Sequence, residues 1–219
     1  DFKLNEKLGR FLNPNEVAEL CNHYKLPILK DEIHSIGELS KKEIHFPIVL
    51  KAIGEKIIHK TDLKGVALNI KTKSELIKTA EEMIWNFSSK NIQLDKFLIQ
   101  PFLKTKYELL VGAFRDPSFG PMIMFGSGGK YVEYLDDTVM RSAYLTANDI
   151  DEMINSTKIG KIIQGVRGEE SIDVNVVKSS IENLAQMIIN HKEITEVDLN
   201  PLLVTSENKL FAVDVRIKC

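Results

Sequence analysis

The chain has 219 residues, of which 43% are hydrophobic and 27% are charged, and its formal net charge is −2. This composition is typical of a globular protein that buries a good core, in one domain or in two small subdomains. The nearly balanced charge gives no basic field for nucleic acid, and the apolar stretches are far shorter than the roughly 20 residues of a membrane-spanning helix. Cys21 and Cys219 are far apart and fit no zinc spacing, so we expect a protein of the reducing cytoplasm.

A short helix is predicted near the start of the chain. Asn13 supplies a cap, Pro14 takes the first helical position, and Glu16 stands three residues after the cap. We expect this helix to end near Tyr24.

Apolar runs predict strands at residues 47–53, 65–70 and 96–100, the last of them stopped by a proline. Between the second and third strands, Thr72 and Glu75 form a capping box that starts a helix. The apolar residues of that helix recur at helical spacing and are expected to be buried: Leu76, Ile77, Ala80, Met83, Ile84 and Phe87.

Two further strands are predicted at residues 107–115 and 121–125, and the second runs into the glycine-rich segment 126–129. A subdomain break is expected near residues 101–106, where a proline ends one strand before the next begins.

Helices are predicted at residues 147–155 and 173–190, the first of them starting from a capping box between Thr146 and Asp149. Strands and helices are thus mixed without strict alternation. This order favours an α+β fold over a doubly wound parallel sheet.

The last two predicted strands carry the strongest functional signal. Runs rich in Val, Leu and Ile flank a polar turn, which predicts a β-hairpin. With the turn centred near Glu207, Asn200 lies opposite Asp214, and Asp198 lies opposite Arg216.

Strand alternation places these four facing residues on one side of the hairpin. A carboxylate opposite an amide oxygen, with a second carboxylate nearby, is a ligand set that Mg²⁺ takes when nucleotide phosphates complete its shell. An ordinary amphipathic hairpin with a hydrated face explains the pattern equally well.

Three other residues in the first part of the chain have side chains suited to phosphate chemistry. Lys51 lies within an apolar strand and either contacts phosphate oxygens, reaches the surface or pairs with a carboxylate. His59 is a possible phosphoryl acceptor, with Lys60 beside it to neutralise phosphate charge. Most isolated histidines are structural or solvated, so both interpretations stay open.

Later residues have similar alternatives. Glu108 either binds ribose hydroxyls or is an exposed strand residue. The glycine-rich segment 126–129 is either an anion-binding nest or a tight strand connection, and it is not a Walker loop. Arg115, Arg141 and Arg167 are candidate clamps for nucleotide phosphate or carboxylate, although ion pairs with Asp or Glu explain them as well.

Seven segments, taken in order, carry a family resemblance. They are P-I-V-L-K at 47–51, I-I-H-K-T-D at 57–62, G-V at 65–66, E-L-L-V-G-A-F-R-D-P-S-F-G-P at 108–121, G-S-G-G-K-Y-V-E at 126–133, G-V-R-G at 165–168 and E-V-D-L-N-P-L at 196–202. Over nearly its whole length the chain resembles the ATP-grasp (β) subunit of ADP-forming acetyl-CoA synthetases, which are relatives of succinyl-CoA synthetase.

The resemblance implies an ATP-grasp fold in which two α+β subdomains, residues 24–103 and residues 1–23 with 104–219, clamp ATP or ADP. It also implies a reaction, acyl-CoA + ADP + phosphate ⇌ carboxylic acid + CoA + ATP. The expected partner is a CoA-binding α subunit that carries its own phosphohistidine. No Rossmann fingerprint for CoA is present in this chain itself.

Carried over residue by residue, the resemblance implies a nucleotide site. Lys51 matches the lysine that contacts the nucleotide phosphates. Gln100, Pro101 and Phe102 match the hinge whose backbone binds adenine, and Glu108 matches the ribose contact.

The resemblance implies catalytic and metal-binding residues as well. Asn200 and Asp214 match two Mg²⁺ ligands, and Asp198 matches an acid that faces the partner's phosphohistidine. His59, next to Lys60, matches a histidine that takes up the phosphoryl group on the ATP-grasp side.

The chain departs from the family at Lys64, where the usual sequence H-K-S-D-V-G-G-V has its first glycine. The change affects a loop near the phosphates. Two other functions remain open: an ATP-grasp ligase that passes an acyl phosphate to an amine, and a nucleotide-sensing module that regulates an acetyltransferase.

Overall fold

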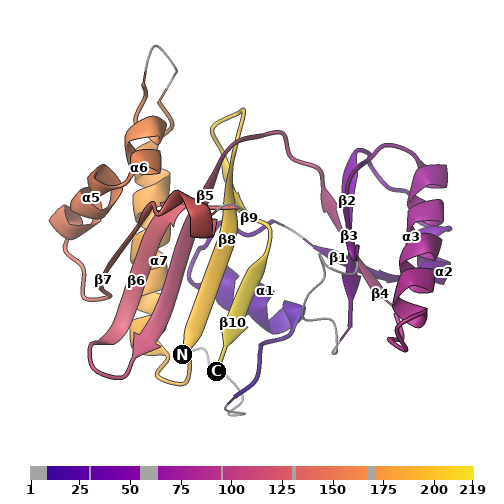
Figure 1. The fold of residues 1–219 in the computed structure, drawn as a ribbon, viewed down its shortest axis with the longest axis horizontal. Helices are drawn as coiled ribbons and strands as arrows, with labels where there is room; N and C mark the ends of the chain where they lie inside the picture. Colours follow the sequence, from indigo (N-terminus) through magenta and orange to yellow (C-terminus); the bar gives the residue numbers. More distant parts are fainter. Residues whose placement is uncertain (1–8, 30, 55–63, 95, 130–131, 167–170) are drawn as a thin grey trace. The chain divides into compact units, whose positions relative to one another are not determined.

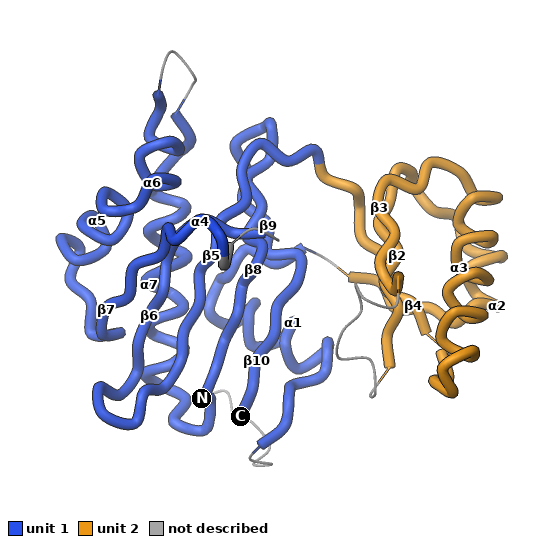
Figure 2. The backbone as a smooth tube through the Cα atoms, viewed as in Figure 1, with its two compact units in different colours: residues 1–29, 104–219 blue, residues 30–103 orange. Residues whose placement is uncertain are grey.

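The contacts of the chain divide it into two units, shown in the computed structural model of Figures 1 and 2. Unit 1 comprises residues 1–29 and 104–219, and unit 2 comprises residues 30–103. The first boundary follows residue 29, where the sequence interpretation places it after residue 23. The structure describes residues 9–29, 31–54, 64–94, 96–129, 132–166 and 171–219.

Unit 2 is an antiparallel sheet in the order β1-β4-β2-β3 with its core against α3. Its elements are β1 Glu32–Ser35, α2 Ile36–Leu39, β2 Ile48–Ile53, β3 Val66–Ile70, α3 Lys73–Ser88 and β4 Lys96–Pro101.

The helix α3 begins at the predicted cap. The Glu75 N–H donates to Thr72 Oγ1, while the Glu75 carboxylate accepts from the Lys71 N–H. The predicted apolar face packs on the sheet, with Ile77 and Ile84 only partly buried at its border. Its fully buried members are Leu76, Ala80, Met83 and Phe87.

Unit 1 contains the larger antiparallel sheet, in the order β10-β8-β5-β6-β7, with β9 paired to β8. Its elements are α1 Pro14–His23, β5 Thr105–Asp116, β6 Gly120–Ser127, α4 Val132–Leu135, β7 Thr138–Ser142, α5 Ala147–Ser156, α6 Lys158–Ile163, α7 Val174–Asn190, β8 Glu196–Thr205, β9 Leu210–Ala212 and β10 Val215–Lys218.

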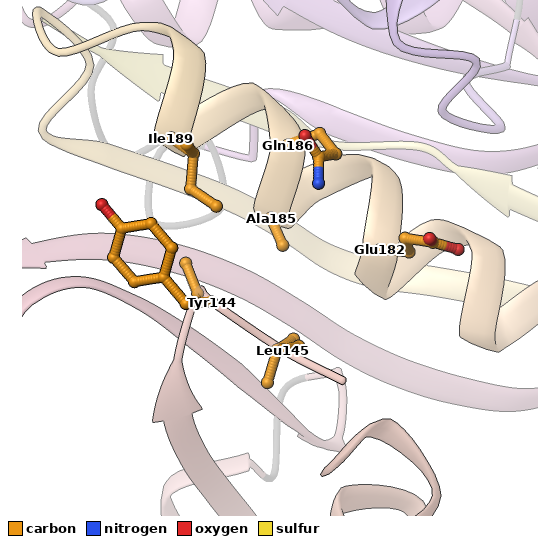
Figure 3. Close-up of a pocket in the computed structure, with 7 residues that line it drawn as sticks. Tyr144, Leu145, Glu182, Ala185, Gln186 and Ile189 are labelled. Carbon is orange, nitrogen blue, oxygen red and sulfur yellow. The ribbon is translucent and has the colours of Figure 1, made fainter. Parts of the chain in front are cut away.

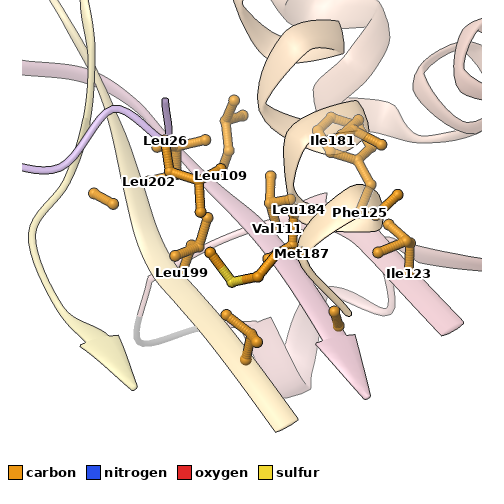
Figure 4. Close-up of a cluster of buried hydrophobic side chains, with 14 of the residues drawn as sticks. Leu26, Leu109, Val111, Ile123, Phe125, Ile181, Leu184, Met187, Leu199 and Leu202 are labelled. Carbon is orange, nitrogen blue, oxygen red and sulfur yellow. The ribbon is translucent and has the colours of Figure 1, made fainter. Parts of the chain in front are cut away.

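One face of this sheet packs against α7 and forms the core of unit 1 (Figure 4). Val111 and Phe125 of the sheet and Leu184 and Met187 of α7 are completely buried there. Burying side chains of this size contributes about 1.5–3 kcal/mol each to stability, so the sheet and α7 are a firm support for residues on the opposite face.

The long predicted elements are confirmed. Capping boxes are present at Asn13 and at Thr146, where α1 and α5 begin. The elements missing from the sequence interpretation are β1, α2, α4, β7 and α6, none of which exceeds six residues. Among the described residues, no helix has the length and apolar character needed to cross a membrane.

Candidate functional site

The C-terminal hairpin has the predicted register. Asp198 of β8 pairs with Arg216 of β10, and β9 continues along β8 without a change of register. Asn200 therefore lies opposite Asp214, in the short break between β9 and β10.

The predicted faces of the hairpin are also found. Val197 and Leu199 are buried in the core of unit 1. Because side chains alternate along a strand, the partly exposed Asp198 and Asn200 lie on the face turned away from α7.

Two carboxylates repel each other on this face. Burial and then the charge of Asp214 raise the pKa of Asp198 to about 6, against the opposing effect of Arg216. Arg216 Nη2 lies 4.0 Å from Asp214 Oδ2, and both side chains are partly exposed. A bound cation would relieve the repulsion between the two acids.

The glycine-rich segment after β6 contacts the amide of Asn200. The Gly129 N–H donates to Asn200 Oδ1 over 2.9 Å. The two preceding N–H groups, of Ser127 and Gly128, donate to the carbonyl oxygens of Asp137 and Glu108. The backbone of this segment is thus engaged by the protein, which favours a tight strand connection over an anion-binding nest.

Glu108 lies against the same segment. A Cβ added to Gly129 would come within 1.8 Å of Glu108 Oε2, and the φ of +82° at Gly129 is a conformation that favours glycine. The structure therefore brings Glu108 and Asn200, which are 92 residues apart in the printed sequence, to one glycine. Glu108 itself is exposed at the start of β5.

Arg115 does not join this cluster. Its guanidinium donates to the carbonyl oxygens of Ile188 and His191 at the end of α7, and also to Ile194. Arg115 follows Glu108 by seven positions on one strand, a separation of about 23 Å. Its role in the structure is to bind the carbonyl groups at the end of α7.

Lys51 and Gln100 lie together on one face of the sheet in unit 2. Lys51 pairs with Leu98, and Gln100 pairs with the neighbouring Val49. The side chains of Lys51 and Gln100 are buried, 9% and 3% exposed, on the face opposite α3. Gln100 Nε2 donates to Asp31 Oδ1.

The predicted hinge residues follow at the end of β4. Pro101 closes the strand opposite Ile48, and the Phe102 N–H donates to the Pro47 carbonyl. They stand just before the boundary between the two units, which follows residue 103.

His59, Lys60 and Arg167 lie outside the described residues. Lys64, at the position of the family's glycine, is described and has a φ of +52°. This left-handed conformation is the one that a glycine adopts without strain, so the lysine keeps a glycine-like backbone at this point.

A surface pocket lies between residues 143–145 and the helix α7 (Figure 3). It is lined by residues 143–145 and by four residues of α7 that include Glu182 and Gln186. The Ala143 N–H donates to the carbonyl of Pro121, at the opposite end of β6 from Ser127. Six residues of strand, or about 20 Å, separate these two ends.

The donor set around Asn200 fits a magnesium ion that also binds phosphate. Asp214 and Asn200 offer hard oxygen ligands, with Asp198 two residues away from Asn200 on the same strand. Among the described residues, no group of three His, Cys, Asp or Glu side chains forms a complete metal site. Mg²⁺ commonly takes one or two carboxylates and completes its shell with phosphates and water.

The raised pKa of Asp198 predicts an unusual pH dependence of stability. A carboxyl group whose pKa rises on folding, here from 3.8 to about 6, binds more protons in the folded state. Its contribution to the free energy of unfolding therefore falls as pH increases through this interval. We expect Asp198→Asn to raise the unfolding midpoint of the nucleotide-free chain at pH 7 by roughly 2–4 °C, or about 1 kcal/mol.

Thermal unfolding at pH 4, 5, 6 and 7 measures this effect, which should vanish at pH 4. Glu207→Gln is the control on the same hairpin, because a hydrogen bond from Lys209 holds the pKa of Glu207 below its ordinary value. An Asp198→Asn curve that follows the wild type at every pH would contradict the expectation.

Comparisons with known proteins agree on one family. A profile of the ATP-grasp domain matches residues 3–219. The β subunit of acetate–CoA ligase (ADP-forming) I from Pyrococcus furiosus is 33% identical over 207 residues, which are 92% of this chain and 89% of that protein. The ADP-forming 4-hydroxybutyrate–CoA ligase of Nitrosopumilus maritimus is 34% identical over 98% of this chain, which covers 32% of the ligase. The chain thus spans about a third of the longer relative and nearly all of a separate β subunit.

Solved structures give the same result. Acetyl-coenzyme A synthetase 1 from Ca. Korarchaeum cryptofilum, in complex with coenzyme A and Ca-AMPCP, superposes with a TM-score of 0.86 at 33% identity and covers 95% of this chain and 93% of its own. The complex of that enzyme with Mg-AMPPCP gives a TM-score of 0.80 at 32% identity, over 95% and 92% of the two chains. The predicted ATP-grasp fold is confirmed, and the chain belongs to the ATP-grasp family of the β subunits of ADP-forming acetyl-CoA synthetases.

Proposed function

We propose that this chain is the nucleotide-binding β part of an ADP-forming acyl-CoA synthetase that works in the cytoplasm. The reaction is acyl-CoA + ADP + phosphate ⇌ carboxylic acid + CoA + ATP. The observation that carries the proposal is the cluster of Asp198, Asn200 and Asp214 on one face of the sheet, in a chain that spans 89% of a β subunit named for this chemistry.

In this proposal Asn200 and Asp214 hold Mg²⁺. The ion supplies charge neutralisation at the transferring phosphoryl group. Asn200 is already oriented by the Gly129 N–H, so its amide does not have to be ordered when the ion arrives. The carboxylate of Asp214 loses its long contact with Arg216 and gains a stronger partner.

The nucleotide contacts follow from the matched positions. Lys51 binds phosphate oxygens, and its buried methylene groups leave its ammonium few orientations. Gln100, Pro101 and Phe102 present the hinge backbone to the base. Glu108, exposed beside Gly129, accepts hydrogen bonds from the ribose hydroxyls.

The partner in this proposal is a CoA-binding subunit or domain that presents a phosphohistidine. The related archaeal enzyme was solved with a phosphohistidine segment pointing towards its nucleotide binding site. Asp198, partly exposed on the open face of the hairpin, faces that imidazole and stabilises its positive charge. His59 receives the phosphoryl group on this chain's side, and Lys60 beside it neutralises phosphate charge.

Reconstitution with a CoA-binding partner tests the function. The complex is expected to form ATP from ADP and phosphate only when acyl-CoA is present, and to carry acid-labile phosphate during turnover. An enzyme that stays free of phosphate while it consumes ATP and an amine would instead be an ATP-grasp ligase of another kind. Nucleotide binding without any phosphoryl transfer would point to a regulatory module.

Lys51→Met is expected to weaken binding of ADP by about tenfold, because one charge-assisted hydrogen bond to phosphate is lost. Methionine keeps the length and apolar stem of lysine, so the β2 strand should stay folded. Equilibrium titration with ADP measures the effect. The control is Lys96→Met at the exposed start of β4, opposite Ile53, and equal losses in the two variants would refute the assignment.

A further inference from the structure

Asp137, between α4 and β7, is a buried carboxylate with three strong donors. Its side chain accepts from the N–H groups of Lys158 and Ile159 at the start of α6, at 2.6 and 2.9 Å, and from Ser127 Oγ at 2.6 Å. Burial raises its pKa, yet these hydrogen bonds hold the pKa of Asp137 below the ordinary value. The residue is 5% exposed. The Asp137 carboxylate thus links α6 to the glycine-rich segment through hydrogen bonds to both.

The glycine-rich segment is held on both sides. The Ser127 N–H donates to the backbone carbonyl of Asp137 over 3.0 Å, and the Gly128 N–H donates to the carbonyl of Glu108 over 2.9 Å. A Cβ on Gly128 would come within 2.2 Å of the Leu109 carbonyl oxygen. These contacts hold the segment between β5 and Asp137.

The next amide of this segment reaches the metal-ligand candidate. The Gly129 N–H donates to Asn200 Oδ1 over 2.9 Å. An asparagine amide has an oxygen and an NH₂ group of similar shape, and only the oxygen accepts from an N–H. This hydrogen bond therefore selects the orientation of Asn200, and the second lone pair of Oδ1 remains for a cation.

We propose that Asp137 is a positioning residue that acts through Ser127 and Gly129 to present the Asn200 oxygen to the metal ion. The inference rests on the proposed function, in which Asn200 binds Mg²⁺. Asp137 itself does not touch the nucleotide.

The competing explanation is that Asp137 only caps α6. Two substitutions separate these roles. Ser127→Ala removes the side-chain link to the glycine-rich segment and leaves the bonds to α6. Thr157→Ala removes the cap at the start of α6, where Thr157 Oγ1 accepts from the Gly160 N–H, and leaves the link to Ser127 in place.

Two measurements on the full chain read out the position of Asn200. Hydrogen exchange by NMR reports how well the Gly129 amide is protected without any nucleotide. The Mg²⁺ concentration that half-saturates ADP binding reports the metal site. We expect Ser127→Ala to speed exchange at Gly129 and to raise the half-saturating Mg²⁺ concentration, each by about tenfold, and Asp137→Asn to do the same.

Thr157→Ala should lower the unfolding midpoint without moving either quantity. The inference is overturned if Ser127→Ala leaves both quantities unchanged, or if Thr157→Ala moves them as much. A wild-type chain that binds ADP equally well with and without Mg²⁺ would overturn the proposed metal site as well. Mg²⁺-dependent binding in the wild type with unaffected variants would overturn the positioning role alone.

Discussion

Asp214→Asn is expected to weaken Mg²⁺-dependent binding of ADP by at least about 100-fold. The substitution keeps the shape of the side chain and removes the charged ligand opposite Asn200. Loss of a group that only supports a metal ligand already lowers metal affinity or activity by about 10–100-fold. Loss of a ligand of the ion itself should therefore reach or exceed the upper value. Calorimetric titration with ADP, with and without Mg²⁺, measures the loss.

Glu207→Gln is the matched control for Asp214→Asn. It removes one carboxylate from the turn of the same hairpin, where Glu207 is exposed and pairs with Lys209. This variant should bind Mg-ADP as the wild type does. If both variants lose affinity equally, the net charge of the hairpin and not the Asp214 ligand is responsible.

His59→Ala is expected to abolish acyl-CoA-driven ATP synthesis, with a loss on the order of 10³-fold or more in the complex with a CoA-binding partner. The loss is expected because the His59 imidazole is the proposed phosphoryl acceptor, and alanine has no nitrogen to attack phosphorus. Binding of Mg-ADP should stay within about twofold, since His59 acts in transfer and not in nucleotide binding. The two assays together separate the role of His59 from that of Asp214.

The control for His59→Ala is His45→Ala, which removes an exposed histidine just before β2. It should leave the rate of ATP synthesis and the phosphate content of the complex unchanged. Full synthesis by His59→Ala would remove His59 from the mechanism and leave the phosphoryl group to pass directly between the nucleotide and the partner.

The hairpin that carries the metal-ligand candidates was predictable because its turn centre and its buried face determine its register. Once the turn centre is known, every pair in an antiparallel hairpin follows, and the buried face fixes the register. Asp198 faces Arg216 as predicted, and Val197 and Leu199 point into the core. Capping boxes were equally informative, because Asn13 and Thr146 act on residues within one helical turn.

The elements that the sequence did not reveal are short. The strands β1 and β7 lie at sheet edges, and β7 is only partly buried along its length. Such strands need few apolar residues, so their local signal is weak. The helices α2 and α6 have at most six residues, too few for a helical repeat to be recognised.

Contacts between distant residues were beyond local patterns. Asp137 binds atoms 10 to 22 positions away, and Gly129 reaches Asn200 across 71 positions. Arg115 was a candidate clamp for phosphate, but in the structure its guanidinium binds carbonyl groups at the end of α7. A guanidinium suits both kinds of acceptor. Residue type alone does not separate these roles, and the fold decides between them.

The most direct test of the nucleotide site is thermal unfolding of the purified chain with Mg-ADP. At a ligand concentration 100 times the dissociation constant, binding adds about 2.7 kcal/mol to the free energy of unfolding. For a chain of this size the midpoint should rise by roughly 5–10 °C, and the rise should require Mg²⁺. No rise with Mg-ADP or Mg-ATP, even with a CoA-binding partner present, would contradict the account.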